Sequence, residues 1–187
     1  MFMTAGAACL FGLRPAASRD IDALNRVIER AVMSWPLPER VKWLSLPSYL
    51  YQSIDLDHLT IIVAEDMAGA ILGVAAWEAA NPRDLPAGKT GLLLHGLYVD
   101  PDHWHRGIGS CLLVRAKEAV RQSNCGGLLV KAQAQAGGFF QAREMELLPV
   151  LNAGRDYAHR YWWESATPGP LRQSACGSQG GTCADKT

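Results

Sequence analysis

The sequence LYVDPDHWHRGIGSCLL, residues 97–113, joins an apolar run to an amphipathic run through a turn that holds two glycines. This order predicts a strand, a turn and a helix. At a helix N-terminus several backbone N–H groups lack partners, and the helix dipole adds partial positive charge. Gly107 and Gly109 leave those donors uncovered, and His105 and Arg106 add side-chain donors or charge. The turn therefore predicts a site for a phosphate or a pyrophosphate.

Two well-known phosphate motifs do not fit this turn. A Walker A loop needs Gly-Lys followed by Ser or Thr, and that triplet is missing here. A Rossmann fingerprint needs a third glycine where Leu112 stands, and it belongs to an early βαβ unit, whereas three predicted strands precede this turn. A plain structural turn would explain the two glycines equally well, so the flanking residues have to decide.

The rest of the chain is predicted to form strands and helices around this turn. Apolar and β-branched runs indicate strands, and apolar residues three or four apart indicate helices. Gly96, inside one of the strands, predicts a bulge or a close backbone approach. The predicted strands are 10–14, 60–66, 71–78, 92–100, 128–132, 146–150 and 157–164, and the predicted helices run from an N-cap at Ser18 to Trp35, over 38–46, from 108 to Gly126, and over 135–145.

Length and composition fit one folded domain. The chain has 187 residues, 49% of them apolar, and 18 basic residues balance 18 acidic ones. No overall field therefore attracts nucleic acid or an acidic membrane, and no segment reaches the about 20 apolar residues of a membrane span. We expect a flexible leader at 1–9, a domain at 10–164 and a flexible, low-complexity tail at 165–187.

The five cysteines are scattered and odd in number, which is not the pattern of a disulfide framework. The expected location is therefore the cytoplasm, where thiols stay reduced. Cys176 and Cys183 are close enough in sequence for a small disulfide loop.

The flanks of the turn resemble motif A of the GCN5-related N-acetyltransferase (GNAT) superfamily. In that motif a strand ending in Val-x-Pro leads to Arg/Gln-x-x-Gly-x-Gly/Ala and a helix. Here Val99-Asp100-Pro101 ends the strand, and Gly107-Ile108-Gly109 fills the glycine positions. The element order over residues 10–164 is also similar. The resemblance implies a single-domain α/β (α+β) fold, with a mixed, mostly antiparallel sheet flanked by helices and splayed where acetyl-CoA binds.

By the same resemblance, acetyl-CoA is the co-substrate, and its pyrophosphate lies on the backbone N–H groups of the turn. We expect no metal, for the reason of spacing given below. Three positions depart from the family pattern. Trp104 stands at the Arg/Gln position, and Phe140 stands where a tyrosine commonly protonates the departing thiolate; Glu144 replaces a glycine and suggests a changed turn. The implied acetyl-CoA contacts are Leu97, Tyr98, Val99, His105, Arg106, Gly107, Ile108, Gly109, Ser110 and Phe140.

Acetyl transfer to an amine needs a general base, because an ammonium group must lose a proton before it attacks a thioester. Histidine has an ordinary pKa of about 6.5, near working pH. His95 lies where aralkylamine acetyltransferases carry a similar catalytic histidine, and Glu78, on the preceding predicted strand, is the second candidate. Tyr157, His159, Tyr161 or water could supply the missing acid. Each of these side chains could equally be a packed or surface residue.

Two further readings concern the same region. Backbone N–H groups around the predicted bulge could stabilise the oxyanion that develops on the thioester carbonyl. Asp100, Asp102, His103 and His105 invite a metal site, but a spacing of two in a loop gives no fixed ligand face.

We therefore expect an N-acetyltransferase that acts on a primary amine of a small molecule or peptide by direct attack in a ternary complex, and a homodimer is plausible. The alternative is a non-catalytic acyl-CoA-binding or sensor module on the same fold, which Phe140 suggests; a nucleotide-binding protein is a weaker third. The acceptor is not identified. The aromatic stretch 35–51 fits either a lid over a small, partly apolar amine or ordinary core packing.

Overall fold

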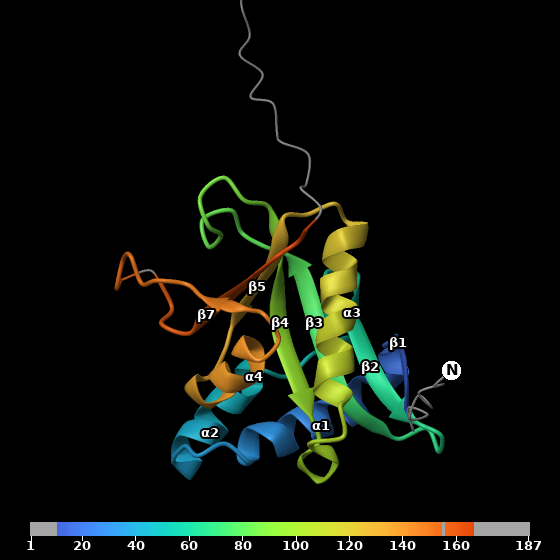
Figure 1. The fold of residues 1–187 in the computed structure, drawn as a ribbon. Coiled ribbons are helices and arrows are strands. Elements are labelled where there is room, and N and C mark those ends of the chain that lie inside the picture. Colours follow the sequence, from blue (N-terminus) through green and yellow to red (C-terminus); the bar gives the residue numbers. More distant parts are fainter. Residues whose placement is uncertain (1–10, 155, 167–187) are drawn as a thin grey trace, which may run out of the picture.

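The computed structural model describes residues 11–154 and 156–166, which contain a seven-stranded sheet (Figure 1). In space the strands follow the order β1, β2, β3, β4, β5, β7, β6. β4 and β5 run parallel, and every other neighbouring pair is antiparallel. The predicted mixed, mostly antiparallel sheet is confirmed. The strands are β1 Phe11–Pro15, β2 Thr60–Asp66, β3 Ile71–Ala79, β4 Gly91–Val99, β5 Gly127–Lys131, β6 Glu146–Leu147 and β7 Arg160–Glu164.

Helices cover both faces of this sheet (Figure 1). One apolar core lies between α3 and the sheet, and a second lies between α1 and the opposite face. Among the described residues, no helix combines the length and the apolar character needed to cross a membrane. The helices are α1 Ile21–Met33, α2 Glu39–Ser45, α3 Ile108–Gln122 and α4 Gly137–Gln141, and the 3-10 turns are η1 Ser18–Asp20, η2 Leu46–Ser48, η3 Ser53–Asp57, η4 Pro101–His103 and η5 Ala134–Ala136.

The predicted elements and the observed ones agree best where the sequence is most regular. β2 has the predicted bounds, but the predicted helix over 135–145 was wrong in extent, because only Gly137–Gln141 is α-helical. Glu144 ends that segment with a φ of 60°, and it adopts the left-handed turn that glycine favours. The predicted strand 146–150 shrinks to two residues, since Pro149 has no N–H to donate to a ladder.

The predicted strand 157–164 begins only at Arg160. The predicted leader, nearly all of the predicted tail, and Cys9, Cys176 and Cys183 lie outside the described residues.

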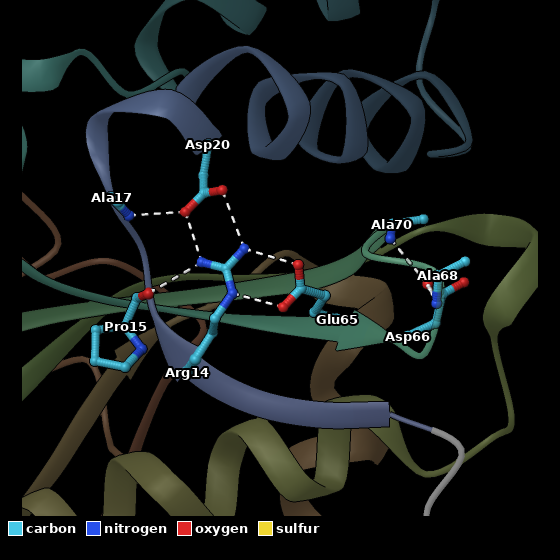
Figure 2. A network of polar contacts seen from close by, with 8 residues as sticks. All are labelled: Arg14, Pro15, Ala17, Asp20, Glu65, Asp66, Ala68 and Ala70. Atoms are coloured by element: carbon cyan, nitrogen blue, oxygen red, sulfur yellow. Dashed lines mark hydrogen bonds and ion pairs between the residues drawn. The ribbon is translucent and has the colours of Figure 1, made fainter.

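The predicted N-cap at Ser18 was wrong, because a 3-10 turn precedes α1 and its third residue, Asp20, organises the chain instead. The Asp20 carboxylate accepts the N–H of Ala17 at 2.8 Å and the guanidinium of Arg14 at 2.6 Å (Figure 2). Arg14 also donates to Glu65 at 2.6 and 3.0 Å. Its hydrogen bonds lower the pKa of both carboxyl groups. Arg14 thus ties β1 to the entry of α1 and to β2.

β4 and β5 pair over only four residues, from Gly91–Leu94 on one strand and Gly127–Val130 on the other. Beyond that point β4 continues to Val99 along β3, whereas β5 ends at Lys131 (Figure 1). The two strands therefore separate, and past Leu94 the described chain places no strand against the edge of β4 that faces β5. This is the splay that the resemblance implied.

A bulge lies in β4 where the two strands begin to separate. Ala76 of β3 pairs with Gly96, but the next residue, Trp77, pairs with Leu94. One residue of β4, His95, is therefore left over in the register. The bulge predicted from Gly96 is confirmed, and its extra residue is the histidine that the sequence singled out as a candidate base.

Candidate active site

His95 and Glu78 meet at the bulge. Nε2 of His95 lies 2.6 Å from Oε1 of Glu78, and each side chain is 39% exposed. Trp77 belongs to the core on the α3 face, so the pleat turns its neighbour Glu78 toward the α1 face. The structure thus joins, on that face, two residues that the sequence offered separately as candidates for the base.

A cavity of about 710 Å³ occupies the gap between the separating strands. Its walls come from β4 between Leu94 and Val99, from the end of β5 and the chain after it, from the turn before α3 and from α4. Ala31, Trp35 and Tyr49 close the cavity on the α1 side of the sheet. The predicted site residues that line this cavity are His95, Leu97, Tyr98, Val99, His105, Gly107, Ile108, Gly109, Ser110 and Phe140.

The turn before α3 presents bare backbone to this cavity. Gly107 has a φ of 82°, and a Cβ there would meet no heavy atom within 4 Å. His105 also has a positive φ, of 61°. The amide of Cys111 is the first in α3 to donate a helical hydrogen bond, to the carbonyl of Gly107 at 3.0 Å. The amides of Ile108, Gly109 and Ser110 lie before the start of this hydrogen-bond pattern. Such an arrangement can bind an anion.

Arg143 places a guanidinium beside the first turn of α3. Its Nη2 and Nε lie 2.6 and 3.0 Å from Oγ of Ser110, and its Nη1 donates to the carbonyl of Phe139 at 2.9 Å. The guanidinium also lies over the Phe139 ring, 3.8 Å from the centroid. These contacts hold the charge at the cavity wall. Arg143 was not among the residues predicted from the sequence, because one arginine after a short apolar segment looks like an ordinary surface charge.

An aromatic wall, which we define as Trp35, Tyr49 and Tyr98, lines the cavity from the α1 side. Trp35 and Tyr49 meet edge to face with centroids 5.4 Å apart, and the centroids of Tyr49 and Tyr98 lie 6.4 Å apart. Nε2 of Gln133, after β5, donates to the hydroxyl of Tyr49 at 3.3 Å. Burial raises the pKa of Tyr98, so its phenol stays neutral at physiological pH.

Three predicted site residues do not line the cavity: Glu78, Arg106 and Tyr157. Glu78 reaches it only through His95. The exposed Arg106 side chain donates to the carbonyl of Asp102 at 3.3 Å. Tyr157 is 42% exposed and lies in the chain before β7, where its ring packs edge-on against His159.

Phe140 lies in the cavity wall, where its ring stacks on Tyr161 with centroids 5.7 Å apart. Both rings are buried. Tyr161 therefore packs against Phe140, and it is not among the residues that line the cavity.

The loop of Asp100 and Asp102 is held by ion pairs. Arg30 of α1 lies 2.8 Å from Asp100 and 2.6 Å from Asp102. Burial opposes ionisation of Asp100, yet the amide of Asp102 and the Arg30 guanidinium together hold the pKa of its carboxyl below its ordinary value. Among the described residues, no group of three or more His, Cys, Asp and Glu side chains could hold a metal ion.

Trp104 takes part in the same loop. Its Nε1 donates to the carbonyl of Val99 at 2.9 Å, and its ring lines the cavity. Trp104, which replaces the Arg or Gln of the family motif, thus connects the loop to the end of β4.

A known protein family and several solved structures are similar to this chain. The model of the acetyltransferase (GNAT) family matches residues 25–145. No curated protein sequence matches the chain.

Several solved structures have a similar fold. The PaiA N-acetyltransferase from Thermoplasma acidophilum, in complex with coenzyme A, is 14% identical with a TM-score of 0.64, over 83% of this chain and 99% of that one. A GNAT family acetyltransferase from Brucella melitensis, in complex with acetyl-CoA, is 16% identical with a TM-score of 0.60, over 86% and 92%. A GCN5-related N-acetyltransferase from Ralstonia eutropha JMP134 is 18% identical with a TM-score of 0.62, over 76% and 95%.

Proposed function

The chain belongs to the GNAT family of acetyltransferases, and from that premise we propose that it moves the acetyl group of acetyl-CoA to a primary amine of a small molecule or peptide by direct attack in a ternary complex. The observation that carries the proposal is one cavity lined by both the bare turn at Gly107 and the His95 ring. An anion site and a candidate base thus share one space between separating strands.

The residues around the turn fit a pyrophosphate group. Open space at the Gly107 Cβ position lets an anion approach the amides of Ile108, Gly109 and Ser110. Arg143 adds a fixed positive charge beside Ser110. We assign the remaining contacts to His105, to the β4 backbone at Leu97, Tyr98 and Val99, and to Phe140. Acetyl-CoA supplies an acetyl group activated as a thioester.

Backbone donors of β4 stabilise negative charge on the acyl oxygen in this proposal. Past Leu94 the edge of β4 that faces β5 has no strand beside it in the described chain. N–H groups on that edge are fixed by pairing of β4 with β3, so they need no reorganisation during the reaction.

His95 acts as the general base, and Glu78 positions it. A carboxylate at 2.6 Å holds a proton on Nε2, which leaves Nδ1 to accept the proton of the attacking amine. Glu78 then stabilises the imidazolium that forms. Phe140 has no proton to give, so the thiolate of coenzyme A takes its proton from water.

A direct test measures binding and turnover separately. Isothermal titration should detect acetyl-CoA binding, and mass spectrometry should detect acetylated product from a panel of primary amines. Absence of acetyl-CoA binding would overturn the proposal.

A non-catalytic acyl-CoA-binding module is the second candidate, and one observation favours it. Phe140, which is buried against Tyr161, stands at the position where the family commonly carries a tyrosine that protonates the departing thiolate. Tight binding of acetyl-CoA without turnover of any amine would support this candidate.

The proposed enzyme is also a homodimer and is located in the cytoplasm. Light scattering tests the oligomeric state, and cell fractionation tests the location.

A further inference from the structure

We propose that the acceptor is an aromatic monoamine: a primary amine carried on an aromatic group, without a second positive charge. The inference rests on the proposed function and concerns the same cavity. It follows from two features of the cavity walls, the rings on the α1 side and the kinds of charge among the lining residues.

The rings and the candidate base share one face of the sheet. Tyr98 belongs to the core on the α1 face, whereas its neighbours Leu97 and Val99 pack against the core on the α3 face. The pleat also turns Glu78, and with it His95, toward the α1 face. An amine that delivers its nitrogen to His95 from this side therefore has its substituent beside the aromatic wall.

The aromatic wall is open to a ligand and is held in place. Trp35 and Tyr49 are only partly buried and line the cavity, and Tyr98 is 8% exposed. Edge-to-face contact fixes Trp35 against Tyr49, and Gln133 holds the Tyr49 hydroxyl. Rings that are already ordered lose little freedom when a flat ring packs on them. Aromatic pairs also gain more than their buried area alone predicts.

The charges on the walls disfavour a second ammonium group. Among the described residues that line the cavity, none is Asp or Glu. The cationic lining residues include Lys131, which pairs with Asp84 at 3.0 Å, and Arg143 at the anion end. A polyamine would leave a desolvated charge without a carboxylate partner, which is costly.

The experiment compares three amines at saturating acetyl-CoA: 2-phenylethylamine, 2-cyclohexylethylamine and spermidine. The first two match in length and size and differ in the aromatic ring. We expect kcat/KM for phenylethylamine to exceed that for cyclohexylethylamine by about fivefold or more, and spermidine to be the poorest acceptor. This comparison uses the unmodified protein, so it does not depend on how a variant folds.

A variant tests whether the aromatic wall causes the preference for phenylethylamine. Trp35→Leu should remove most of the difference between the two cyclic amines and leave the acetyl-CoA Kd unchanged. Trp43→Leu is the matched control, because Trp43 on α2 is 56% exposed and does not line the cavity. Circular dichroism checks that both variants are folded.

The outcomes distinguish the proposed acceptor from the proposed acetyl transfer. Equal kcat/KM for the two cyclic amines, or a preference for spermidine, overturns the aromatic monoamine and leaves acetyl transfer standing. Acetyl-CoA binding without turnover of any amine overturns both. A preference for phenylethylamine that Trp35→Leu abolishes supports both.

Discussion

His95 owes its place to one surplus residue in β4. Without the bulge, the strict alternation of the strand would continue past Leu94, and the ring would not meet Glu78 as it does. In the proposed mechanism, the pair joins a base to a carboxylate that fixes which ring nitrogen carries the proton. Their joint role leads to a prediction for each residue.

His95→Gln should lower kcat by about 100-fold or more, the usual contribution of a general base, and leave the acetyl-CoA Kd within about twofold. Glu78→Gln keeps a hydrogen-bonding oxygen but loses the charge, so kcat should fall by a smaller factor, about tenfold. Steady-state kinetics and calorimetry measure the two quantities. His58→Gln, at an exposed position away from the cavity, is the control. Normal kcat in the His95 variant would transfer the role to Glu78 or to solvent.

Gly107 is required by its backbone conformation, since its surroundings are open. A β-branched residue is strongly disfavoured at a φ of 82°, so Gly107→Val should distort the turn and block the approach of an anion to the amides of α3. The acetyl-CoA Kd should rise tenfold or more, about 1.4 kcal/mol.

Gly88→Val is the matched control for this change. Gly88 also has a positive φ, of 74°, and open space at the Cβ position, but it does not line the cavity. Backbone strain alone should therefore leave acetyl-CoA affinity unchanged. Equal loss of affinity in both variants would count against the anion site.

β5 forms one side of the cavity, and its position depends on close packing against β7. A Cβ at Gly127 would overlap both the Trp162 indole and the Trp163 carbonyl, which are parts of the neighbouring strand. A similar approach occurs on the other side, where a Cβ at Gly91 would meet the carbonyl of Gly127 at 2.7 Å. Two glycines at facing positions therefore let β4, β5 and β7 lie together before β4 and β5 separate.

Gly127→Ala should destabilise the protein by about 2 kcal/mol, because backbone and a packed indole cannot move aside cheaply. Urea denaturation measures this as a lower midpoint at an unchanged slope. Gly12→Ala in β1 is the control, since a Cβ there meets nothing within 4 Å. Equal midpoints for the two variants would show that the β5–β7 contact is looser than the structure has it.

α3 illustrates how one helix serves both the fold and the site. Its apolar residues, among them Leu112 and Val120, pack on the sheet, and its first turn faces the cavity. Gly73 of β3 permits this approach, because a Cβ there would lie 2.9 Å from the Ile108 side chain. The depth at which the helix sits thus sets where its first amides point.

The acid stability of the whole molecule should depend on the network of Arg14, Asp20 and Glu65. Hydrogen bonds from Arg14 lower the pKa of Asp20 in the folded state, so unfolding at acid pH takes up a proton. The stabilisation is complete above the ordinary carboxyl pKa of about 4, and it is lost as pH falls from there through the lowered pKa.

Asp20→Asn should therefore lower stability at neutral pH and flatten its decline below about pH 4. Urea denaturation midpoints recorded from neutral to acid pH test this. Asp22→Asn, at an exposed position two residues further along the chain, is the matched control. A profile for Asp20→Asn that runs parallel to that of the unmodified protein would show that Asp20 contributes no pH-dependent term.

Regular patterns in the sequence were enough to predict the elements that form the centre of the fold. β2 was predicted to the residue, α3 from its apolar period, and the bulge from a glycine inside a strand. The predictions were poorer after Gln133, where the short helix and two short strands are set by tertiary contacts and by a left-handed turn at Glu144. Propensity is weak over such short segments, so packing decides them.

By itself the sequence determined the family resemblance, the turn with its bare amides and the histidine in the bulge, because each depends on residues close together in the chain. Only the tertiary structure decided that Glu78 contacts His95, that Arg143 lies at Ser110, and that Trp35, Tyr49 and Tyr98 form one wall. Those contacts join residues from separate elements. They depend on strand register and on how closely each helix packs, and no local pattern encodes either.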